Sequence, residues 1–334
     1  MKTREICLVS RPKGWPSEAD FESRDAEIGE LSEGKVLLRV LWLSVDPYMR
    51  GRMNDVKSYV PPFKLGEAIS GGGIAQVVES RDPRFQPGDF VSANLRWREF
   101  DVQPGETLRN LDPDQAPLSA HLGVLGMPGL TAFVGLRRIG ELRPSDTVYV
   151  SAAAGAVGSM AGQIAKISGA KVIGSAGSDQ KVRALLEMGF DSAFNYREVP
   201  VAKALSDYVP GGIDLYFDNV GGEHLEAALY HMSDYGRVVM CGAVSQYNLD
   251  NRPAGPSNLM LVVTKRLTLK GFIVSDHNDL YQPFLSEVSG WLRHGKLQYR
   301  HTEREGLSQA PRSLIDMMRG ENLGKMLVKV ADPN

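Results

Sequence analysis

The sequence holds few residues of the kind that build metal sites. Its 334 residues include two cysteines, Cys7 and Cys241, without any C-x-x-C pair, and six histidines scattered without metal-ligand spacing. A four-cysteine zinc site within one chain is impossible, and a catalytic zinc held by cysteine and histidine is not expected. No cluster of carboxylates suggests another metal. We therefore expect a site that works without a metal ion.

Long apolar runs and long runs of one charge are also missing. No apolar stretch approaches the length of a membrane span, and residues 1–6 lack the apolar core of a signal peptide. The formal net charge is −2, which gives no reason to expect binding to nucleic acid. With 43% hydrophobic and 23% charged residues, the composition is that of an ordinary globular protein. We expect a cytoplasmic protein that acts on a small molecule.

What the sequence does contain is organised around residues 146–158. The short apolar run at 148–150 is typical of a strand buried on both faces of a parallel sheet. A turn of tiny residues and then a helical pattern follow. The G-x-G-x-x-G fingerprint reads here as Ala153-x-Gly155-x-x-Gly158, with alanine at the first glycine. Strand, turn and helix together predict a phosphate cradle of the dinucleotide-binding kind.

From about residue 122 onward, strands and helices alternate. Such alternation predicts a doubly wound parallel sheet, the Rossmann arrangement. The strands expected lie at 147–151, 171–175, a run ending near 194, 213–218, 237–241 and 268–274.

The N-terminal region has a different pattern. Short strand-like runs separated by proline and glycine turns predict a partly open β-barrel. Two further runs near the C-terminus, 298–301 and 325–330, have no neighbours in the helical part, so we expect them to return to the first domain. The predicted domains are therefore 1–123 with 294–334, and 124–293.

The end of the second Rossmann strand indicates which nucleotide is preferred. NAD enzymes usually place Asp or Glu about twenty residues after the glycine turn, where it binds ribose hydroxyls. Here Gly174 occupies that place, and Lys181 follows at the start of the next helix. Asp179 is the contrary feature, although an acid near a helix N-terminus is often only a cap. The pattern favours NADP(H) over NAD(H).

A family resemblance covers nearly the whole chain. The sequence resembles the zinc-independent medium-chain dehydrogenase/reductases, in the branch of prostaglandin reductases, plant double-bond reductases and bacterial curcumin reductase. This resemblance implies a GroES-like catalytic domain, a partly open β-barrel, joined to a Rossmann domain that binds NADP(H). The segments that carry it are Ser44–Met53, Leu125–Ala132, Ala152–Gly158, Phe194–Tyr196, Asp218–Gly222, Cys241–Asn248 and Asn322–Met326.

The resemblance also implies roles for matching residues. The glycine turn would lie along the pyrophosphate, a lysine and a tyrosine would bind the 2′-phosphate, and the stretches near 241–247 and 272–274 would follow the nicotinamide. The implied cofactor-binding residues are Gly155, Ala156, Val157, Gly158, Lys181, Tyr196, Asn219, Cys241, Gly242, Ala243, Ser245, Tyr247, Phe272, Ile273, Val274 and Asn322.

Several of these residues have a simpler reading. Lys181 could be a solvated helix residue and Tyr196 a surface packing residue. Asn219 could be a turn residue before two glycines, and Cys241 a buried strand hydrophobe. A motif match is a hypothesis that structural context must test.

The chemistry implied by the resemblance is reduction of an activated C=C bond. Hydride goes to the β-carbon of an enone or enal, the carbonyl becomes an enolate, and the α-carbon then takes a proton. Tyr247, just beyond a sheet strand, is the first candidate to stabilise the enolate or relay the proton, and Tyr48 is the second. Either could instead be an aromatic wall of the pocket. A cofactor ribose hydroxyl could also do this work.

Other readings stay open at this point. The chain could be a quinone reductase, a zinc-free alcohol dehydrogenase, or a non-catalytic NADPH-binding protein. The loop 247–260 is a plausible lid. The run 266–274 predicts a long strand, and if it forms an exposed sheet edge it would pair with its copy in a homodimer; the alternative is an interior strand.

Overall fold

The computed structural model describes residues 1–251 and 253–333. They form two compact units, residues 1–122 with the described residues from 301 onward, and residues 123–300.

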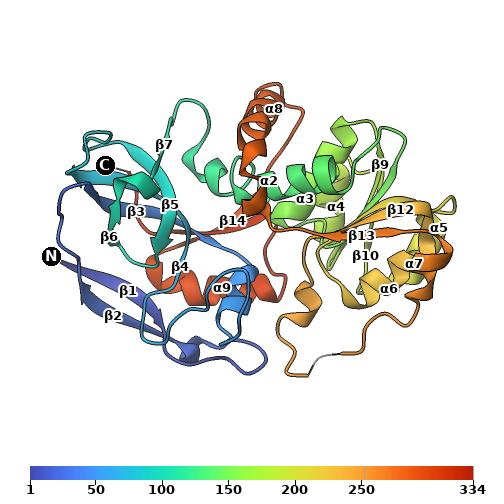
Figure 1. The fold of residues 1–334 in the computed structure, drawn as a ribbon, viewed down its shortest axis with the longest axis horizontal. Coiled ribbons are helices and arrows are strands. Elements are labelled where there is room, and N and C mark those ends of the chain that lie inside the picture. The colour runs from blue at the N-terminus through green and yellow to red at the C-terminus, as the bar shows by residue number, and fades with distance from the viewer. Residues whose placement is uncertain (252, 334) are drawn as a thin grey trace. The chain divides into compact units, whose positions relative to one another are not determined.

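The first unit is built on a seven-stranded mixed sheet (Figure 1). Along the sheet the order is β14-β15-β3-β4-β5-β7, and β6 also pairs with β3. A separate antiparallel pair is formed by β1 (Lys2–Leu8) and β2 (Phe21–Glu27), and the helices are α1 (Tyr48–Arg52) and α9 (Ala310–Met318). The sheet strands are β3 (Lys35–Val45), β4 (Ser70–Ser80), β5 (Phe90–Arg96), β6 (Phe100–Pro104), β7 (Arg109–Leu111), β14 (His301–Glu305) and β15 (Lys325–Lys329).

The C-terminal strands return to this first sheet. Strand β15 pairs antiparallel with β3, Met326 opposite Val45, and β14 lies parallel to β15. The run expected at 298–301 was placed too early, because β14 begins only at His301. A chain that leaves the first sheet and comes back to it makes the first unit discontinuous in sequence.

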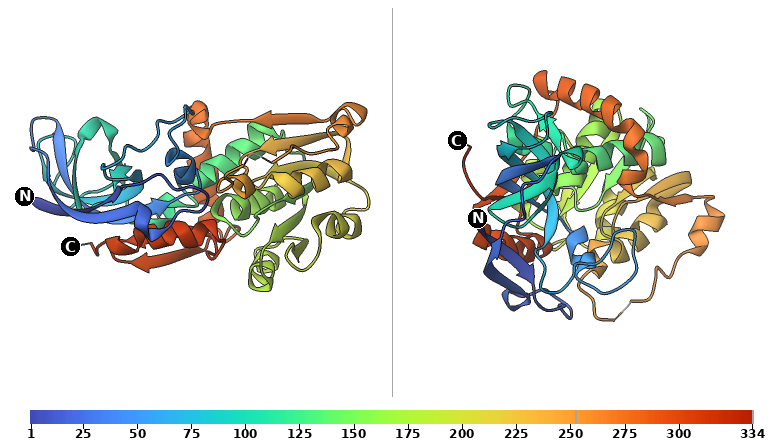
Figure 2. Two further views of the ribbon diagram at one scale, coloured as in Figure 1. Left: turned by 90° about the horizontal axis from the view of Figure 1, so that it is seen from below. Right: turned by 60° about the vertical axis from the view of Figure 1, so that its left-hand side comes forward.

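The second unit holds a six-stranded sheet in the order β10-β9-β8-β11-β12-β13, and every pair is parallel. Helices lie on both faces of this sheet (Figure 2). The predicted doubly wound arrangement is therefore confirmed. Its strands are β8 (Thr147–Val150), β9 (Lys171–Ala176), β10 (Ser192–Asn195), β11 (Ile213–Asp218), β12 (Met232–Met240) and β13 (Thr268–Gly271). Its helices are α2 (Met127–Val134), α3 (Ala156–Ile167), α4 (Asp179–Glu187), α5 (Val201–Tyr208), α6 (Gly222–His231), α7 (Met260–Thr264) and α8 (Tyr281–Arg293).

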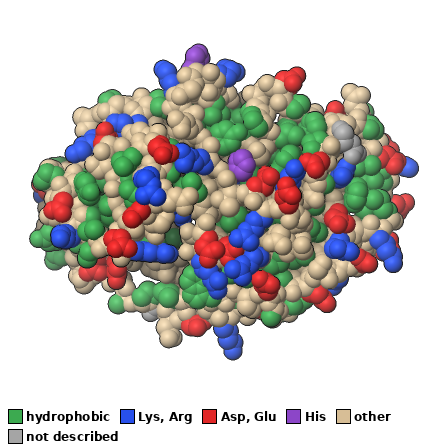
Figure 3. Space-filling view, turned by 180° about the vertical axis from the view of Figure 1, so that it is seen from behind, with side chains coloured by type: hydrophobic (Ala, Val, Ile, Leu, Met, Phe, Trp, Pro, Cys, Tyr) green, Lys and Arg blue, Asp and Glu red, His purple; other side chains and the backbone are tan. Residues whose placement is uncertain are grey.

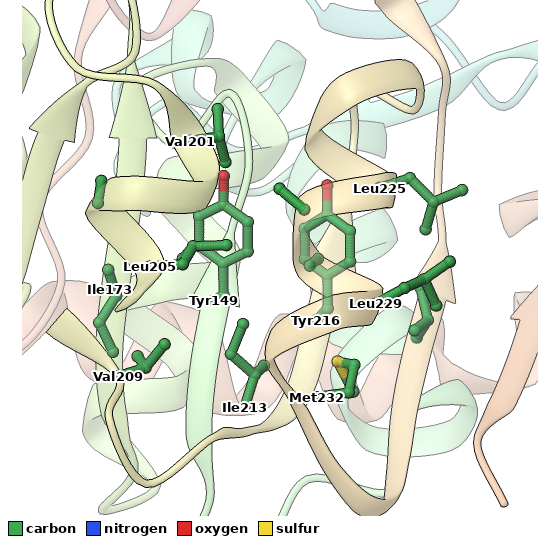
Figure 4. Packing of buried hydrophobic residues seen from close by; sticks show 14 of the residues in the cluster. Tyr149, Ile173, Val201, Leu205, Val209, Ile213, Tyr216, Leu225, Leu229 and Met232 are labelled. Atoms are coloured by element: carbon green, nitrogen blue, oxygen red, sulfur yellow. The ribbon is translucent and has the colours of Figure 1, made fainter. Parts of the chain in front are cut away.

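One core of this unit lies against the central strands. Val148, Tyr149 and Val150 are fully buried, as the apolar run predicts. Tyr149 and Tyr216 stack with ring centroids 4.9 Å apart, among aliphatic side chains of α5 and α6 (Figure 4). Both hydroxyls point toward the same end of the strands (Figure 4). The core is therefore apolar around the middle of these strands and polar at one end of them.

Strand β13 differs from its prediction in length. The pattern at 266–274 predicts a long strand, but β13 has only four residues, Thr268–Gly271. It pairs with β12 alone and ends the sheet, so it is an edge strand and not an interior one.

The surface shows no marked separation of charge on the face drawn in Figure 3, where Lys and Arg side chains alternate with Asp and Glu. Within residues 1–251 and 253–333, no helix is both long and apolar enough to cross a bilayer.

The turn after β8 contains a strained residue. Ala152 has φ +46°, in the left-handed region that is unfavourable for residues with a Cβ. Its neighbour Ala153 is fully buried and does not have a positive φ. Of these two adjacent alanines, Ala152 therefore has a strained backbone conformation and Ala153 does not.

We predict that Ala152→Gly raises the thermal unfolding midpoint. Relief of the left-handed strain gains about 1–2 kcal/mol, and the larger freedom of glycine in the unfolded chain takes back about 0.4–1 kcal/mol. The matched control is Ala153→Gly, which relieves no strain and empties a buried site, so its midpoint should fall. Midpoints that fall equally in both variants would contradict the strain argument. Scanning calorimetry of the two variants beside the wild type is the measurement.

Candidate nucleotide site

The six parallel strands end at one edge of their sheet, and almost all the predicted site residues follow those ends. The turns that begin after β8, β9, β10, β11, β12 and β13 all leave from this carboxyl edge. In open α/β sheets ligands bind at that edge. Tyr48 and Asn322 are the exceptions, since they belong to the first unit.

The turn between β8 and α3 is packed too tightly for larger side chains. A Cβ on Gly158 would lie 2.5 Å from the Ala152 carbonyl oxygen, so only glycine fits there. Gly155 is the N-cap of α3, and the amides of Ala156, Val157 and Gly158 follow it in the first turn. The first N–H groups of a helix have no partner within the helix. Their position favours an anion such as a pyrophosphate.

The alanine at the first position of the fingerprint has a structural explanation. Ala153 Cβ would lie 2.9 Å from a Cβ on Gly174 in the neighbouring strand β9. The methyl group of Ala153 therefore fits because the residue opposite it, Gly174, has no side chain. Gly174 lies where an NAD enzyme would be expected to carry its acid, so the same residue serves packing and removes a carboxylate.

The phenol of Tyr196 and the guanidinium group of Arg197 lie close to Gly177. A Cβ on this glycine would lie 2.9 Å from the Tyr196 hydroxyl and 3.3 Å from Nε of Arg197. Burial, and after it the positive charge of Arg197, lower the pKa of the Lys181 ammonium group. Lys181 is half-buried and Arg197 is exposed, and two cations whose charges interact favour a bound anion. Arg197 was missed by sequence reasoning, although it directly follows the predicted Tyr196.

Asp179, the contrary residue, is engaged elsewhere. The N-cap of α4 is Ser178, whose hydroxyl accepts the Lys181 N–H at 3.3 Å. Asp179 is the first helical residue, and its carboxylate accepts a hydrogen bond from Asn195 Nδ2 at 3.0 Å. The cap reading was therefore wrong in detail.

His224 is a second residue that the sequence did not indicate. Its buried ring meets Tyr196 edge-on, with centroids 5.0 Å apart and an interplanar angle of 81°. Burial lowers the pKa of His224 to about 4, so the ring is uncharged at neutral pH. Among the residues described, Nε2 finds no hydrogen-bond partner. His224 therefore supports the Tyr196 ring by packing and adds no charge.

Asn219 connects two turns of the edge. Its side-chain amide donates to the Ser151 carbonyl at 2.8 Å, and its backbone N–H donates to Ser151 Oγ at 3.0 Å. Its carbonyl accepts the Val244 N–H at 3.1 Å. The turn-residue reading of Asn219 thus describes its contacts within the protein, while its predicted contact with the cofactor stays a prediction.

The segment after β12 folds back on itself. The Tyr247 hydroxyl accepts the Ala243 N–H at 3.3 Å and lies 3.2 Å from a Cβ placed on Gly242. Ser245 Oγ donates to the Val220 carbonyl at 2.6 Å. Burial raises the pKa of Tyr247, so its phenol stays protonated at neutral pH and keeps its own hydrogen for donation.

Cys241 and residues 272–274 occupy the neighbouring strand ends. Burial, reinforced by Asp218, raises the pKa of the Cys241 thiol to about 12, which makes it an inert hydrophobe at neutral pH. Phe272, the first of the three residues after β13, would lie 3.3 Å from a Cβ on Gly135. Ile273 and Val274 follow it directly. The predicted lid loop, 247–260, includes residue 252, which lies outside the described residues.

Tyr48 and Asn322 are held by their own unit. Tyr48 begins α1, is half-buried, and forms a hydrogen bond with the Arg52 side chain. Burial, reinforced by Asp46, raises the pKa of Tyr48. Asn322 Nδ2 donates to the Gly324 carbonyl at 2.7 Å.

The side chains present do not fit a zinc ion. In the part of the chain that the structure describes, no three His, Cys, Asp or Glu residues lie together as metal ligands would. A zinc site needs three or four such ligands. We therefore derive no step through a metal.

Known proteins resemble this chain along nearly its whole length. A family profile described as the N-terminal domain of oxidoreductase matches residues 4–111, and one described as zinc-binding dehydrogenase matches residues 156–290. An NADP(+)-dependent 2-alkenal reductase of Nicotiana tabacum is 42% identical, over 99% of this chain and 98% of its own length. An NADPH-dependent curcumin reductase of Escherichia coli K12 is 40% identical, over 99% and 97%.

A solved structure agrees with these relatives. The crystal structure of CurA from Vibrio vulnificus in complex with NADPH superposes with a TM-score of 0.95 at 39% identity, covering 99% of this chain and 100% of that one. The predicted fold class, a GroES-like domain with a Rossmann domain, is confirmed. The chain belongs to the medium-chain dehydrogenase/reductase family, in the branch that includes the alkenal and curcumin reductases.

Proposed function

We propose that this chain is an NADPH-dependent reductase of the activated C=C bond in α,β-unsaturated ketones and aldehydes. The observation that carries the proposal is a group of three residues, in a protein whose relatives include an NADP-dependent alkenal reductase: Tyr196 and Arg197 lie close to Gly177, and the charge of Arg197 acts on Lys181. The cations of this group suit a 2′-phosphate, whose presence distinguishes NADP(H) from NAD(H).

The chain's own residues divide the work of holding the nucleotide. The amides of residues 156–158 would receive the pyrophosphate, and Lys181 with Arg197 would neutralise the 2′-phosphate. We propose that the other residues predicted from the sequence to bind the cofactor also contact it, among them Cys241, Phe272 and, from the first unit, Asn322. We further propose that residues 1–123 with 294–334 serve the substrate and residues 124–293 the cofactor.

The reaction requires little acid–base chemistry from the protein. When bound, NADPH supplies a hydride to the substrate β-carbon, and negative charge develops on the carbonyl oxygen. Tyr247 would donate its phenolic hydrogen to that oxygen, because the phenol is neutral and its lone pair already accepts the Ala243 N–H. Tyr48 remains a second candidate donor.

The experiment for this proposal is a panel of acceptors. Oxidation of NADPH should be rapid with an enone or enal and slow with a quinone, and should not occur without an acceptor. Dialysis against a strong chelator should leave the rate unchanged. A rate with quinones above that with enones would make the chain a quinone reductase, and no oxidation with any acceptor would make it a binding protein.

We propose also that the protein is a cytoplasmic homodimer. Among the described residues, strand β13 pairs with β12 on one side only, and Tyr235, Met260 and Val263 in the adjoining segments are exposed hydrophobic residues. The open side of an edge strand can pair with its copy across a two-fold axis. Cys7 and Cys241 are free thiols, which suits a reducing compartment. Light scattering that gives 36.6 kDa, the mass of one chain, would contradict the dimer.

We predict that Lys181→Ala raises the KM for NADPH about ten- to a hundredfold and leaves that for NADH nearly unchanged. A hydrogen bond to a charged group contributes about 1.5–3 kcal/mol, and only NADPH carries the phosphate. The matched control is Arg183→Ala, which removes an exposed cation. Arg183 lies two residues further along the same helix, so its side chain projects from a different face than that of Lys181. Equal losses with both nucleotides would remove Lys181 from the phosphate site.

We predict that Tyr247→Phe lowers kcat on an enone about tenfold or more with little change in NADPH affinity. The ring remains, but the donor to the developing oxyanion is lost, and such donors act mainly in the transition state. Steady-state kinetics with saturating NADPH measure the effect. If Tyr247→Phe keeps the wild-type kcat while Tyr247→Ala loses substrate affinity, the residue is a pocket wall and the proton comes from elsewhere.

A further inference from the structure

Three turns of the nucleotide edge meet at one buried residue, Asp218. Asp218, the last residue of β11, is fully buried. Its Oδ1 accepts the N–H groups of Val220 at 2.9 Å and Gly221 at 2.8 Å, the two amides that lead into α6. Its backbone carbonyl accepts the N–H groups of Cys241 and Gly242 at 2.9 and 3.0 Å. A single residue thus fixes the turn after β11 and the start of the turn after β12.

Asp218 Oδ1 also contacts the turn after β8. Ser151, the first residue after β8, lies with Oγ 3.3 Å from Asp218 Oδ1, and this hydroxyl accepts the Asn219 N–H. The buried Tyr216 hydroxyl donates to Asp218 Oδ1 at 2.7 Å (its ring is labelled in Figure 4). The hydroxyls of Ser151 and Tyr216 therefore close a network between the turns after β8 and β11.

The two oxygens of the carboxyl group are used unequally. Oδ1 collects the contacts from Val220, Gly221, Tyr216 and Ser151, whereas Oδ2 has no hydrogen-bond partner among the described residues. Neither Lys nor Arg forms a salt bridge with it in that part of the chain. The network uses Oδ1 as an acceptor, and we expect an uncharged acceptor at the same place to serve it as well.

We propose that Asp218 is a positioning residue of the nucleotide site: its Oδ1 holds the turns that begin at Ser151 and Asn219, and its backbone carbonyl holds the start of the turn at 241–242, in the arrangement that receives NADPH. This inference rests on the proposed use of NADPH. Asp218 itself lies beneath the turns, fully buried, and acts through the backbone amides that it binds. Preorganised groups bind a ligand more tightly because less freedom is lost on binding.

The neutral amide is the informative substitution. In Asp218→Asn the amide oxygen can take the place of Oδ1 and accept the same hydrogen bonds, and the NH2 group takes the place of Oδ2. Burial raises the pKa of Asp218, which makes ionisation costly in the folded state, so Asp218→Asn tests whether an uncharged acceptor does the same work. Asp218→Ala, by contrast, leaves the Val220 and Gly221 amides without an acceptor.

The chain offers a matched control at the opposite edge of the sheet. Asp146 precedes β8, is equally buried, accepts the Arg143 N–H at 2.8 Å and forms an ion pair with Arg237. Asp146→Ala should lower the thermal midpoint at least as much as Asp218→Ala does, because it removes a buried acceptor and also leaves Arg237 without its partner. It lies far from the turns in question along the strands, so its NADPH affinity should match that of the wild type.

The measurement is the Kd for NADPH from titration of the cofactor fluorescence, with thermal midpoints recorded in parallel. Asp218→Ala should raise the Kd at least about tenfold, and Asp218→Asn should stay within about threefold of the wild type. Should Asp218→Ala fail to fold, Ser151→Ala replaces it, with an expected rise of several-fold. If the wild-type protein itself does not bind NADPH, the proposed function is refuted instead.

Three results would overturn the inference. An unchanged Kd in folded Asp218→Ala, or in Ser151→Ala if that variant is used, would show that the turns hold without the acceptor. A Kd raised equally in Asp218→Asn and Asp218→Ala would show that the charge itself is needed. A Kd raised as much in Asp146→Ala would show that any loosening of this unit weakens NADPH binding.

Discussion

The close approach of the β8–α3 turn to the start of α3 is the constraint on which the nucleotide edge depends. Gly158 cannot carry a Cβ because the Ala152 carbonyl oxygen would lie 2.5 Å from it. This contact presses the helix start against the turn and leaves its first amides facing outward from the sheet edge. The strain at Ala152, with φ +46°, follows from the same tight path of the chain. A tight turn here therefore requires small residues in it and opposite it.

The requirement for small residues spreads to the next strand and affects nucleotide choice. Ala153 replaces the usual first glycine, and the space for its methyl group comes from Gly174 on β9. With glycine there and glycine again at 177, the end of β9 carries no acid, and the Tyr196 hydroxyl can approach the backbone of Gly177 closely. Packing at the turn after β8 is thus linked, through two glycines on the same segment, to the absence of an acid at the end of β9.

The sequence was sufficient for features that depend on local pattern. The buried run 148–150, the glycine turn and the alternation of strands and helices are periodic or local signals, and each lies where it was expected. Lys181 could be selected as a candidate from the sequence because it lies a fixed number of residues after the glycine turn. Arg197 and His224 could not, because their importance comes from the side-by-side placement of β9, β10 and α6 in space. The length of β13 was overestimated because an apolar pattern continues past the last ladder pair at Gly271.

The polar side of the sheet core shows why some site features leave no sequence signal. Tyr149 and Tyr216 lie in a run of apolar residues and read as hydrophobes, and their stacked rings do pack as such. A buried hydroxyl without a partner costs about 1–3 kcal/mol, so each must find one. Tyr149 finds Ser175 at 2.9 Å, and Tyr216 finds Asp218 at 2.7 Å. The core of this unit is therefore continuous with the hydrogen-bond network of its turns. A substitution deep in the apolar core that tilts either ring would move the partner hydroxyl or carboxyl group at the edge, which ties packing in the middle of the sheet to the geometry of the turns.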